Sequence, residues 1–161
     1  MNISRSNKIL VIGLGSPIMK DDAVGLKVSE EIERMHLENV DSRQEAVGGL
    51  EILPMVSGYG MVIIVDAIMA EEYGPGSVII YDPDDFESTV ADVPAHDVNL
   101  ATAIKIGREL HPETMPDTIR FVAIEVVDIQ TMSETMSPSV EAAVPSAVSA
   151  VLHLISEYQK S

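Results

Sequence analysis

Three polar side chains stand where an α/β sheet usually collects its ligands, beyond the carboxyl ends of its strands. Asp22 follows the apolar run at residues 9–12, Asp66 directly follows the run at residues 62–65, and His96 lies in a later loop before a helical segment. Two carboxylates and one imidazole can hold a divalent ion such as Zn, Ni or Co, with open positions filled by water. The residue types therefore make a metal site possible.

Each of the three residues also has an ordinary structural interpretation. An aspartate at the end of a buried strand, as Asp66 is, often only anchors its loop. Asp22 could cap a helix that begins at Ala23, and His96 could be a solvated loop residue. The spacing alone leaves the functional and the structural interpretation of each residue open.

Several other catalytic motifs are absent from the sequence. Gly13-Leu14-Gly15 follows a strand, as in a dinucleotide site, but Ile18 stands at the third glycine position and Pro17 removes a backbone donor. The phosphate-binding G-x-x-x-x-G-K-[ST] loop, the H-E-x-x-H zinc helix and the G-x-S-x-G serine elbow do not occur. A dinucleotide site and nucleophilic serine catalysis therefore lack support.

Apolar runs predict the strands that position the candidate residues. Continuous runs of β-branched residues are typical of strands that are covered on both faces, as in a parallel sheet. The runs lie at residues 9–12, 62–65, 78–80 and 119–126, with a weaker candidate at 40–47. Arg120 and Glu125 interrupt the fourth run, so we expect it to be less completely buried. The runs at 62–65 and 78–80 are either an antiparallel pair or joined by a wide connection.

Apolar residues at helical spacing predict the segments between these strands. The helices lie at residues 24–35, from residue 49 to before Gly58 or Gly60, at 100–110 and at 137–155. In the last helix we expect Ser137 to cap the first turn, which contains Pro138, and Pro145 to cause a kink or a restart. The acidic, proline-flanked segment at residues 82–94 predicts a mobile loop.

Strands that alternate with helices predict a three-layer α/β/α sandwich with a mostly parallel central sheet. The chain has 161 residues, a length that suits a single domain spanning residues 1–161. Within such a domain the loops at the carboxyl ends of the parallel strands converge, which would bring Asp22, Asp66 and His96 toward one edge of the sheet.

Composition narrows the class of partner. The sequence has 10 Lys and Arg against 26 Asp and Glu, a formal charge of −16, which argues against nucleic acid and anionic membranes as partners. Cysteine is absent, so disulfides, thiolate zinc sites and cysteine nucleophiles are excluded. The polar segment at residues 1–8 provides neither a signal peptide nor a membrane span. We therefore expect a soluble, cytoplasmic protein.

The ordered set of motifs resembles the hydrogenase maturation endopeptidases over nearly the whole chain. In that family a strand leads into G-x-G-N and then D-[DE]-[AG]-x-G, to which residues 9–17 and Asp21-Asp22-Ala23-Val24-Gly25 are similar. Ser16 stands where Asn is common, and Val126 follows Glu125 where Pro is common. The remaining similar segments are the helix start at 49–53, the strand with Asp-Ala at 63–67, the histidine segment at 94–97 and the last-helix entry at 137–141.

The resemblance implies an activity. Members of the family are endopeptidases that remove a short C-terminal extension from the large-subunit precursor of [NiFe] hydrogenases, after nickel has been inserted. Residue by residue, the metal-contacting and catalytic groups correspond to Asp22, Asp66 and His96, with Asp22 where some members have Glu. The implied metal is nickel delivered in the substrate precursor, although other divalent ions could occupy the site. We expect a cytoplasmic monomer with this precursor as its partner, and neither nucleic acid nor membrane.

The mechanism and two alternative functions remain open at this level. Cleavage would use a metal-polarised water or strain and positioning in the substrate tail; the lack of an ordinary protease nucleophile favours carboxylate- or metal-assisted attack by water. Asp21 and Glu125 are reserve candidates for a general base or a substrate contact, although we expect both to be solvated acids. The alternatives are a non-enzymatic, nickel-sensing assembly chaperone for the same precursor and, on the glycine loop alone, a small nucleotide-binding module.

Overall fold

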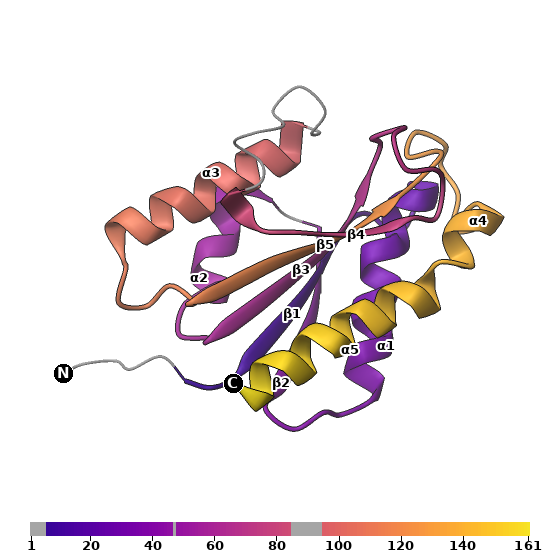
Figure 1. Ribbon diagram of the computed structural model, residues 1–161. Helices are drawn as coiled ribbons and strands as arrows, with labels where there is room; N and C mark the ends of the chain where they lie inside the picture. Colours follow the sequence, from indigo (N-terminus) through magenta and orange to yellow (C-terminus); the bar gives the residue numbers. More distant parts are fainter. Residues whose placement is uncertain (1–5, 47, 85–94) are drawn as a thin grey trace.

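Helices cover both faces of a central sheet, as the alternation of strands and helices predicts (Figure 1). The computed structural model describes residues 6–46, 48–84 and 95–161, with the backbone alone for 95–99. The predicted acidic loop at residues 82–94 lies largely outside the described residues. The three layers confirm the α/β/α sandwich.

The sheet has five strands in the order β2-β1-β3-β5-β4. The strands are β1 (Ile9–Leu14), β2 (Val40–Glu45), β3 (Met61–Ile68), β4 (Val78–Tyr81) and β5 (Thr118–Glu125). All neighbours pair in parallel except β4 and β5, which are antiparallel. Every residue of β1 and β3 is buried, because the apolar runs of these central strands are covered from both sides.

Two sequence expectations about the sheet are settled by β4 and β5. β5 lies between β3 and β4, so the connection from β3 to β4 is the wide one. β5 is less completely buried than β1 and β3, as expected, because Thr118 and Arg120 are partly exposed. Glu125 itself is buried, because backbone N–H groups donate hydrogen bonds to its carboxylate.

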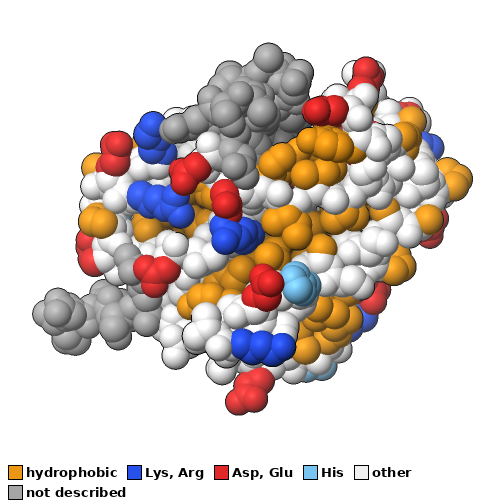
Figure 2. Space-filling view, in the orientation of Figure 1, with side chains coloured by type: hydrophobic (Ala, Val, Ile, Leu, Met, Phe, Trp, Pro, Cys, Tyr) orange, Lys and Arg blue, Asp and Glu red, His pale blue; other side chains and the backbone are white. Residues whose placement is uncertain are grey.

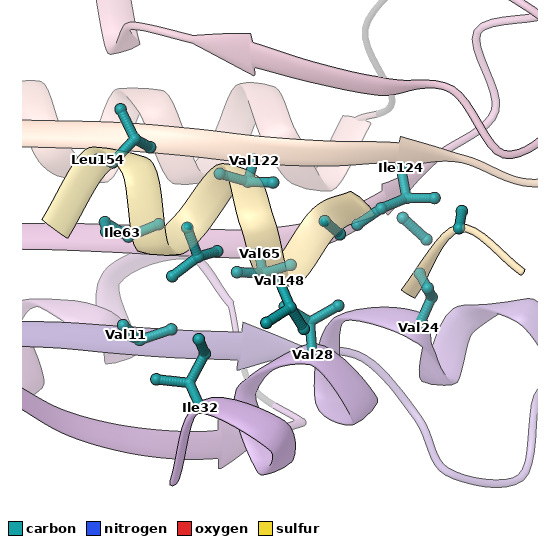
Figure 3. Packing of buried hydrophobic residues seen from close by; sticks show 14 of the residues in the cluster. Val11, Val24, Val28, Ile32, Ile63, Val65, Val122, Ile124, Val148 and Leu154 are labelled. Atoms are coloured by element: carbon teal, nitrogen blue, oxygen red, sulfur yellow. The ribbon is translucent and has the colours of Figure 1, made fainter. Parts of the chain in front are cut away.

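One face of the sheet packs against α1 (Val24–Arg34) and α5 (Val144–Lys160) (Figure 3). Alternate strand residues supply this face, because successive side chains of a strand point to opposite sides. Val11, Ile63 and Val65 meet Val28 and Ile32 of α1 in one buried cluster. The cluster makes α1 a fixed element of the sandwich.

The opposite face packs against η2 (Gly49–Ile52), α2 (Leu53–Val56) and α3 (Ala95–Leu110). The other set of alternate strand residues faces this second cluster. Its fully or almost fully buried members include Leu10, Ile12, Ile52, Val62, Ile64, Leu100, Ile104 and Ile119. Figure 1 shows α2 and α3 on the side of the sheet away from α1 and α5. The two clusters together form the core.

The C-terminal helical segment restarts at Pro145, as predicted. α4 (Pro138–Glu141) ends before α5 begins at Val144, and Pro145 lies in the first turn of α5. Residues 138–160 pass a length and composition test for a membrane span. In the fold, the apolar face of this segment packs in the first core cluster, which is the arrangement of a core helix.

Close contact between α1 and the sheet requires glycine at two positions. A Cβ on Gly25 would lie 2.4 Å from the Val65 carbonyl oxygen and 2.7 Å from that of Leu14. A Cβ on Gly13 would lie 2.2 Å from the Gly25 carbonyl oxygen. The first glycine of the loop that resembles a dinucleotide motif therefore has a packing role between strand and helix.

Acidic side chains are spread over the surface. On the face in Figure 2, Asp and Glu side chains lie among apolar and basic ones, without forming one patch. Lys8 pairs with Asp41 at 3.0 Å and Arg43 with Glu45 at 2.8 Å. Exposed pairs of this kind contribute only about 0.2–1 kcal/mol each. These surface acids therefore serve mainly for solvation.

Candidate functional site

A pocket of about 320 Å³ opens where β1, β2 and β3 reach their carboxyl ends. Asp22 and Asp66 both line the pocket, so the structure brings together two of the three residues predicted from the sequence. The other lining residues are small or mostly apolar: Leu14, Gly15, Ser16, Met19, Ala46, Gly48, Leu100 and Ile129. Apolar walls around carboxylates strengthen electrostatic interactions inside the pocket.

Asp66 lies in β3, which runs on to Ile68, and not at the strand end that the apolar run predicts. The last pair between β1 and β3 joins Gly13 to Val65, so Asp66 is the first residue of β3 beyond that ladder. Asp66 is 4% exposed, and its Oδ1 accepts a hydrogen bond from the backbone N–H of Ala67 at 2.8 Å. The carboxylate thus lies in the crevice that opens where β1 leaves the sheet.

Asp22 lies in the short 3-10 turn η1 (Lys20–Ala23), at the start of α1. Its Oδ2 accepts a hydrogen bond from the backbone N–H of Ser16 at 3.0 Å. Ala23, and not Asp22, is the N-cap residue of α1, which begins at Val24. Asp22 therefore precedes the cap position that the sequence suggested for it.

Gly15 allows the loop after β1 to fold back on Asp22. Its backbone φ of +150° is a value that residues with a side chain rarely adopt, and a Cβ there would lie 1.9 Å from the Asp22 carbonyl oxygen. Together with the hydrogen bond from Ser16, this contact fixes the turn that carries Asp22. The second glycine of the loop thus positions a pocket carboxylate.

His96 lies in the first turn of α3 rather than in the loop before it, since the helix begins at Ala95. Its side chain lies outside the described residues. Leu100, one helical turn later, lines the pocket. Among the side chains that the structure describes, no group of three His, Cys, Asp or Glu could hold a metal.

Asp21 is fully buried, which contradicts the expectation of a solvated acid. Its carboxylate accepts hydrogen bonds from the N–H of Val127 (3.0 Å), the N–H of Asp128 (2.9 Å), and both the N–H (2.6 Å) and the hydroxyl (2.9 Å) of Ser137. Ser137 is the N-cap residue of α4, but its hydroxyl donates to Asp21 and does not cap the helix as predicted.

The surroundings of Asp21 act on its pKa in opposite directions. Burial alone raises the pKa of this carboxyl, because a low dielectric disfavours the charged form. Hydrogen bonds from Ser137, Asp128 and Val127 favour the charged form and together bring the pKa below its ordinary value. Asp21 is therefore a charged anchor that ties the turn carrying Asp22 to the loop after β5.

Glu125 is the second acid that was expected to be solvated and is buried, with 2% of its surface exposed. Its Oε1 accepts hydrogen bonds from the backbone N–H groups of Glu72 and Tyr73, each at 2.9 Å. These donors belong to the loop between β3 and β4. Glu125 thus anchors that loop to the end of β5.

Known hydrogenase maturation proteases are similar to this chain in sequence. A family model described as hydrogenase maturation protease matches residues 26–154. The hydrogenase 2 maturation protease of Escherichia coli K12 is 24% identical over 153 residues, which cover 93% of this chain and 92% of that protein.

Solved structures show the same fold. The hydrogenase maturating endopeptidase HybD from E. coli superposes with a TM-score of 0.77 at 24% identity, covering 93% of each chain. The [NiFe] hydrogenase maturation protease HybD from Thermococcus kodakarensis has a TM-score of 0.74 at 25% identity, covering 92% of this chain and 99% of that one.

Proposed function

Since the chain belongs to the hydrogenase maturation protease family, we propose that it removes the C-terminal extension of a [NiFe] hydrogenase large-subunit precursor after nickel insertion. The observation that carries the proposal is the pocket shared by Asp22 and Asp66. Two carboxylates from different strand-end segments converge there, at the edge of the sheet where open α/β folds bind their ligands. Such a pair can bind a cation and can also move protons.

Nickel belongs to the substrate in this proposal. The chain has no cysteine, so the soft thiolate ligands that hold nickel come from the precursor. Asp22, Asp66 and His96 offer oxygen and nitrogen donors to the same ion, which suit a borderline divalent metal. Contact with the ion then reports that the precursor is loaded. We assign His96 to the same site because Leu100, one turn later in α3, lines the pocket.

Hydrolysis requires a water molecule to attack the carbonyl carbon of the scissile bond. One pocket carboxylate takes a proton from that water, and the proton passes to the leaving amine as the C–N bond breaks. Bound nickel draws the substrate tail against the carboxylates and lowers the entropic cost of the attack. The reaction takes place in the cytoplasm on one protease monomer and one precursor.

Substitutions of the site residues test the proposal. We expect Asp66→Asn and His96→Ala to lower the rate of processing of a nickel-loaded precursor by at least about 100-fold, because each removes a proton-transfer or metal-contact group. Asp84→Asn and His111→Ala change the same residue types at exposed positions, and we expect both to process normally. Mass spectrometry of the precursor gives the rate, and thermal unfolding checks the fold.

Three outcomes are distinguishable in that experiment. Normal processing by folded Asp66→Asn and His96→Ala would remove these residues from the site. Equal losses in the exposed controls would show that the effect is not specific to the pocket. Wild-type protein that binds the loaded precursor without shortening it would instead support the alternative of a non-enzymatic assembly chaperone.

A further inference from the structure

Exposed apolar side chains gather on three loops at the carboxyl edge of the sheet. Among the described residues nine large hydrophobic side chains are exposed, and five of them lie on these loops. We call the five the apolar rim: Ile18 (46% exposed), Met69 (38%), Tyr73 (49%), Val127 (48%) and Met132 (77%). Scattered apolar residues on a surface are ordinary, whereas a continuous group marks an interaction site.

Backbone hydrogen bonds join the loops that carry the rim residues. The N–H of Ser133 donates to the Ile18 carbonyl at 2.8 Å, which sets Met132 beside Ile18. The N–H of Val126 donates to the Ile68 carbonyl at 2.9 Å, so the residues that follow, Val127 and Met69, come from adjoining segments. Figure 1 shows the loop before β4 and the loop after β5 side by side.

Two buried carboxylates hold the rim in place. Asp21 binds the loop that carries Val127, and Glu125 binds the backbone of Tyr73. A surface whose loops are already fixed loses little conformational entropy when a partner binds. The rim is therefore preformed.

The rim borders the candidate pocket. Met19, which follows Ile18, lines the pocket, and so does Ile129 from the loop that carries Val127 and Met132. Met69 follows the end of β3, the strand that supplies Asp66. A macromolecule with its scissile bond at Asp22 and Asp66 must therefore lie over or beside the rim.

We propose that the apolar rim is the docking surface for an apolar patch of the folded precursor beside its scissile bond. The inference rests on the proposed function, because it takes the occupant of the pocket to be part of a protein. It adds that affinity for this substrate comes from apolar contacts outside the pocket. Tyr and Met side chains, both present in the rim, are enriched at protein interfaces.

The charges around the rim favour this occupant over two others. The same loops expose Glu71, Glu72 and Glu134. In a contact with a second copy of the chain, these glutamates would lie near the same glutamates of the other copy, and the like charges would repel. They would also repel an anionic lipid surface. An apolar patch with basic side chains at its margin is the complementary surface.

A matched pair of double variants tests the docking surface. Ile18→Ser with Met132→Ser removes apolar area from the rim, while Ile80→Ser with Leu110→Ser removes it from exposed positions elsewhere (44% and 66% exposed). We expect the rim variant to raise KM for the nickel-loaded precursor about tenfold, with kcat within about twofold of wild type, because hot-spot side chains at an interface contribute energies of that order. We expect the control variant to leave both constants unchanged.

Direct binding separates a failure of docking from a failure of the proposed function. Affinity for the precursor is measured by interferometry in the Asp66→Asn background, with and without the rim substitutions. Equal affinity of the rim and control variants would overturn the docking surface, even where wild-type protein cleaves the precursor. Weaker binding by the rim variant, together with a wild type that does not cleave, would support docking and refute the protease. Dimerisation of the wild type that the rim substitutions abolish would make the rim a self-interface and overturn the inference.

Discussion

At the scale of single residues, the acids in and around the pocket divide into pocket carboxylates and loop anchors. Asp22 and Asp66 line the pocket, whereas the carboxylate of Asp21, next to Asp22, accepts hydrogen bonds from Ser137 and from the loop after β5. Adjacent aspartates thus have different roles. Burial and hydrogen-bond partners determine the role of each aspartate, and the residue type alone does not determine it.

Substituting Asp21 tests its role as a charged anchor. In Asp21→Asn an amide N–H₂ replaces an oxygen that accepts from several donors, so donors face donors. We expect the free energy of unfolding at pH 7 to fall by about 2–3 kcal/mol, the cost of losing hydrogen bonds to a buried charged group. Urea unfolding measures this change.

The lowered pKa of Asp21 also predicts how the free energy of unfolding changes with pH. Because the folded state lowers this pKa, the charged form contributes stability above the ordinary aspartate pKa of about 3.9, and the contribution is lost as pH falls through the folded value. The stability difference between wild type and Asp21→Asn should therefore shrink in acid. A difference that stays constant from pH 7 to pH 3 would contradict the anchor.

At the scale of elements, local patterns predicted most of the fold. Continuous apolar runs predicted β1 and β3, and Pro145 predicted the restart at α5. The buried loop acids were missed because their donors lie far away in the chain. The Asp21–Ser137 hydrogen bonds span 116 residues, and the Glu125–Tyr73 bond spans 52.

Sequence signals for the site were of two kinds. Positions after apolar strands indicated Asp22 and Asp66, since strand ends meet at one edge of a parallel sheet. For Asp21 the one available signal was its place in the D-[DE]-[AG]-x-G segment of the family resemblance. The helix N-cap at Ser137 was misassigned because a buried acceptor competes for its hydroxyl.

The contact between α1 and the sheet gives a prediction at this scale. In Gly25→Ala the new Cβ meets the backbone carbonyls of Val65 and Leu14 at 2.4 and 2.7 Å, so the helix must move. We expect a loss of about 1–3 kcal/mol in unfolding free energy, as for other overpacked cores, and slower processing, since the turn with Asp22 directly precedes α1.

Gly48→Ala is the matched control for Gly25→Ala in the stability measurement. A Cβ on Gly48 meets nothing within 4 Å, and we expect a change within about 0.5 kcal/mol. Equal stabilities of the two variants in urea unfolding would show that the close approach of α1 is not needed.

At the scale of the whole molecule, the two ends of the sheet differ in character. At the amino end, Asp41 accepts hydrogen bonds from Tyr59 (2.6 Å) and Lys8 (3.0 Å). Burial and the neighbouring Asp41 raise the pKa of Tyr59 to about 12, so this hydroxyl stays protonated at neutral pH. The carboxyl end carries the pocket and the rim. A structural end and a functional end are typical of open α/β sheets.

The acidic residues that give the net charge of −16 have several separate roles in this fold. Most acids solvate the surface, Asp21 and Glu125 fix loops, and Asp22 and Asp66 line the pocket. The absence of cysteine is consistent with nickel ligands supplied by the substrate. The role of His96 in the site stays a prediction, because its side chain lies outside the described residues.

The proposed function requires that the C-terminal extension of a large-subunit precursor is removed only when nickel is present. The most direct measurement is the mass of that precursor before and after incubation with the wild-type protein, with and without prior nickel loading. We predict that the loaded precursor loses the mass of its C-terminal extension and that the nickel-free precursor keeps its full mass. An unchanged loaded precursor, or equal shortening of both, would contradict the account.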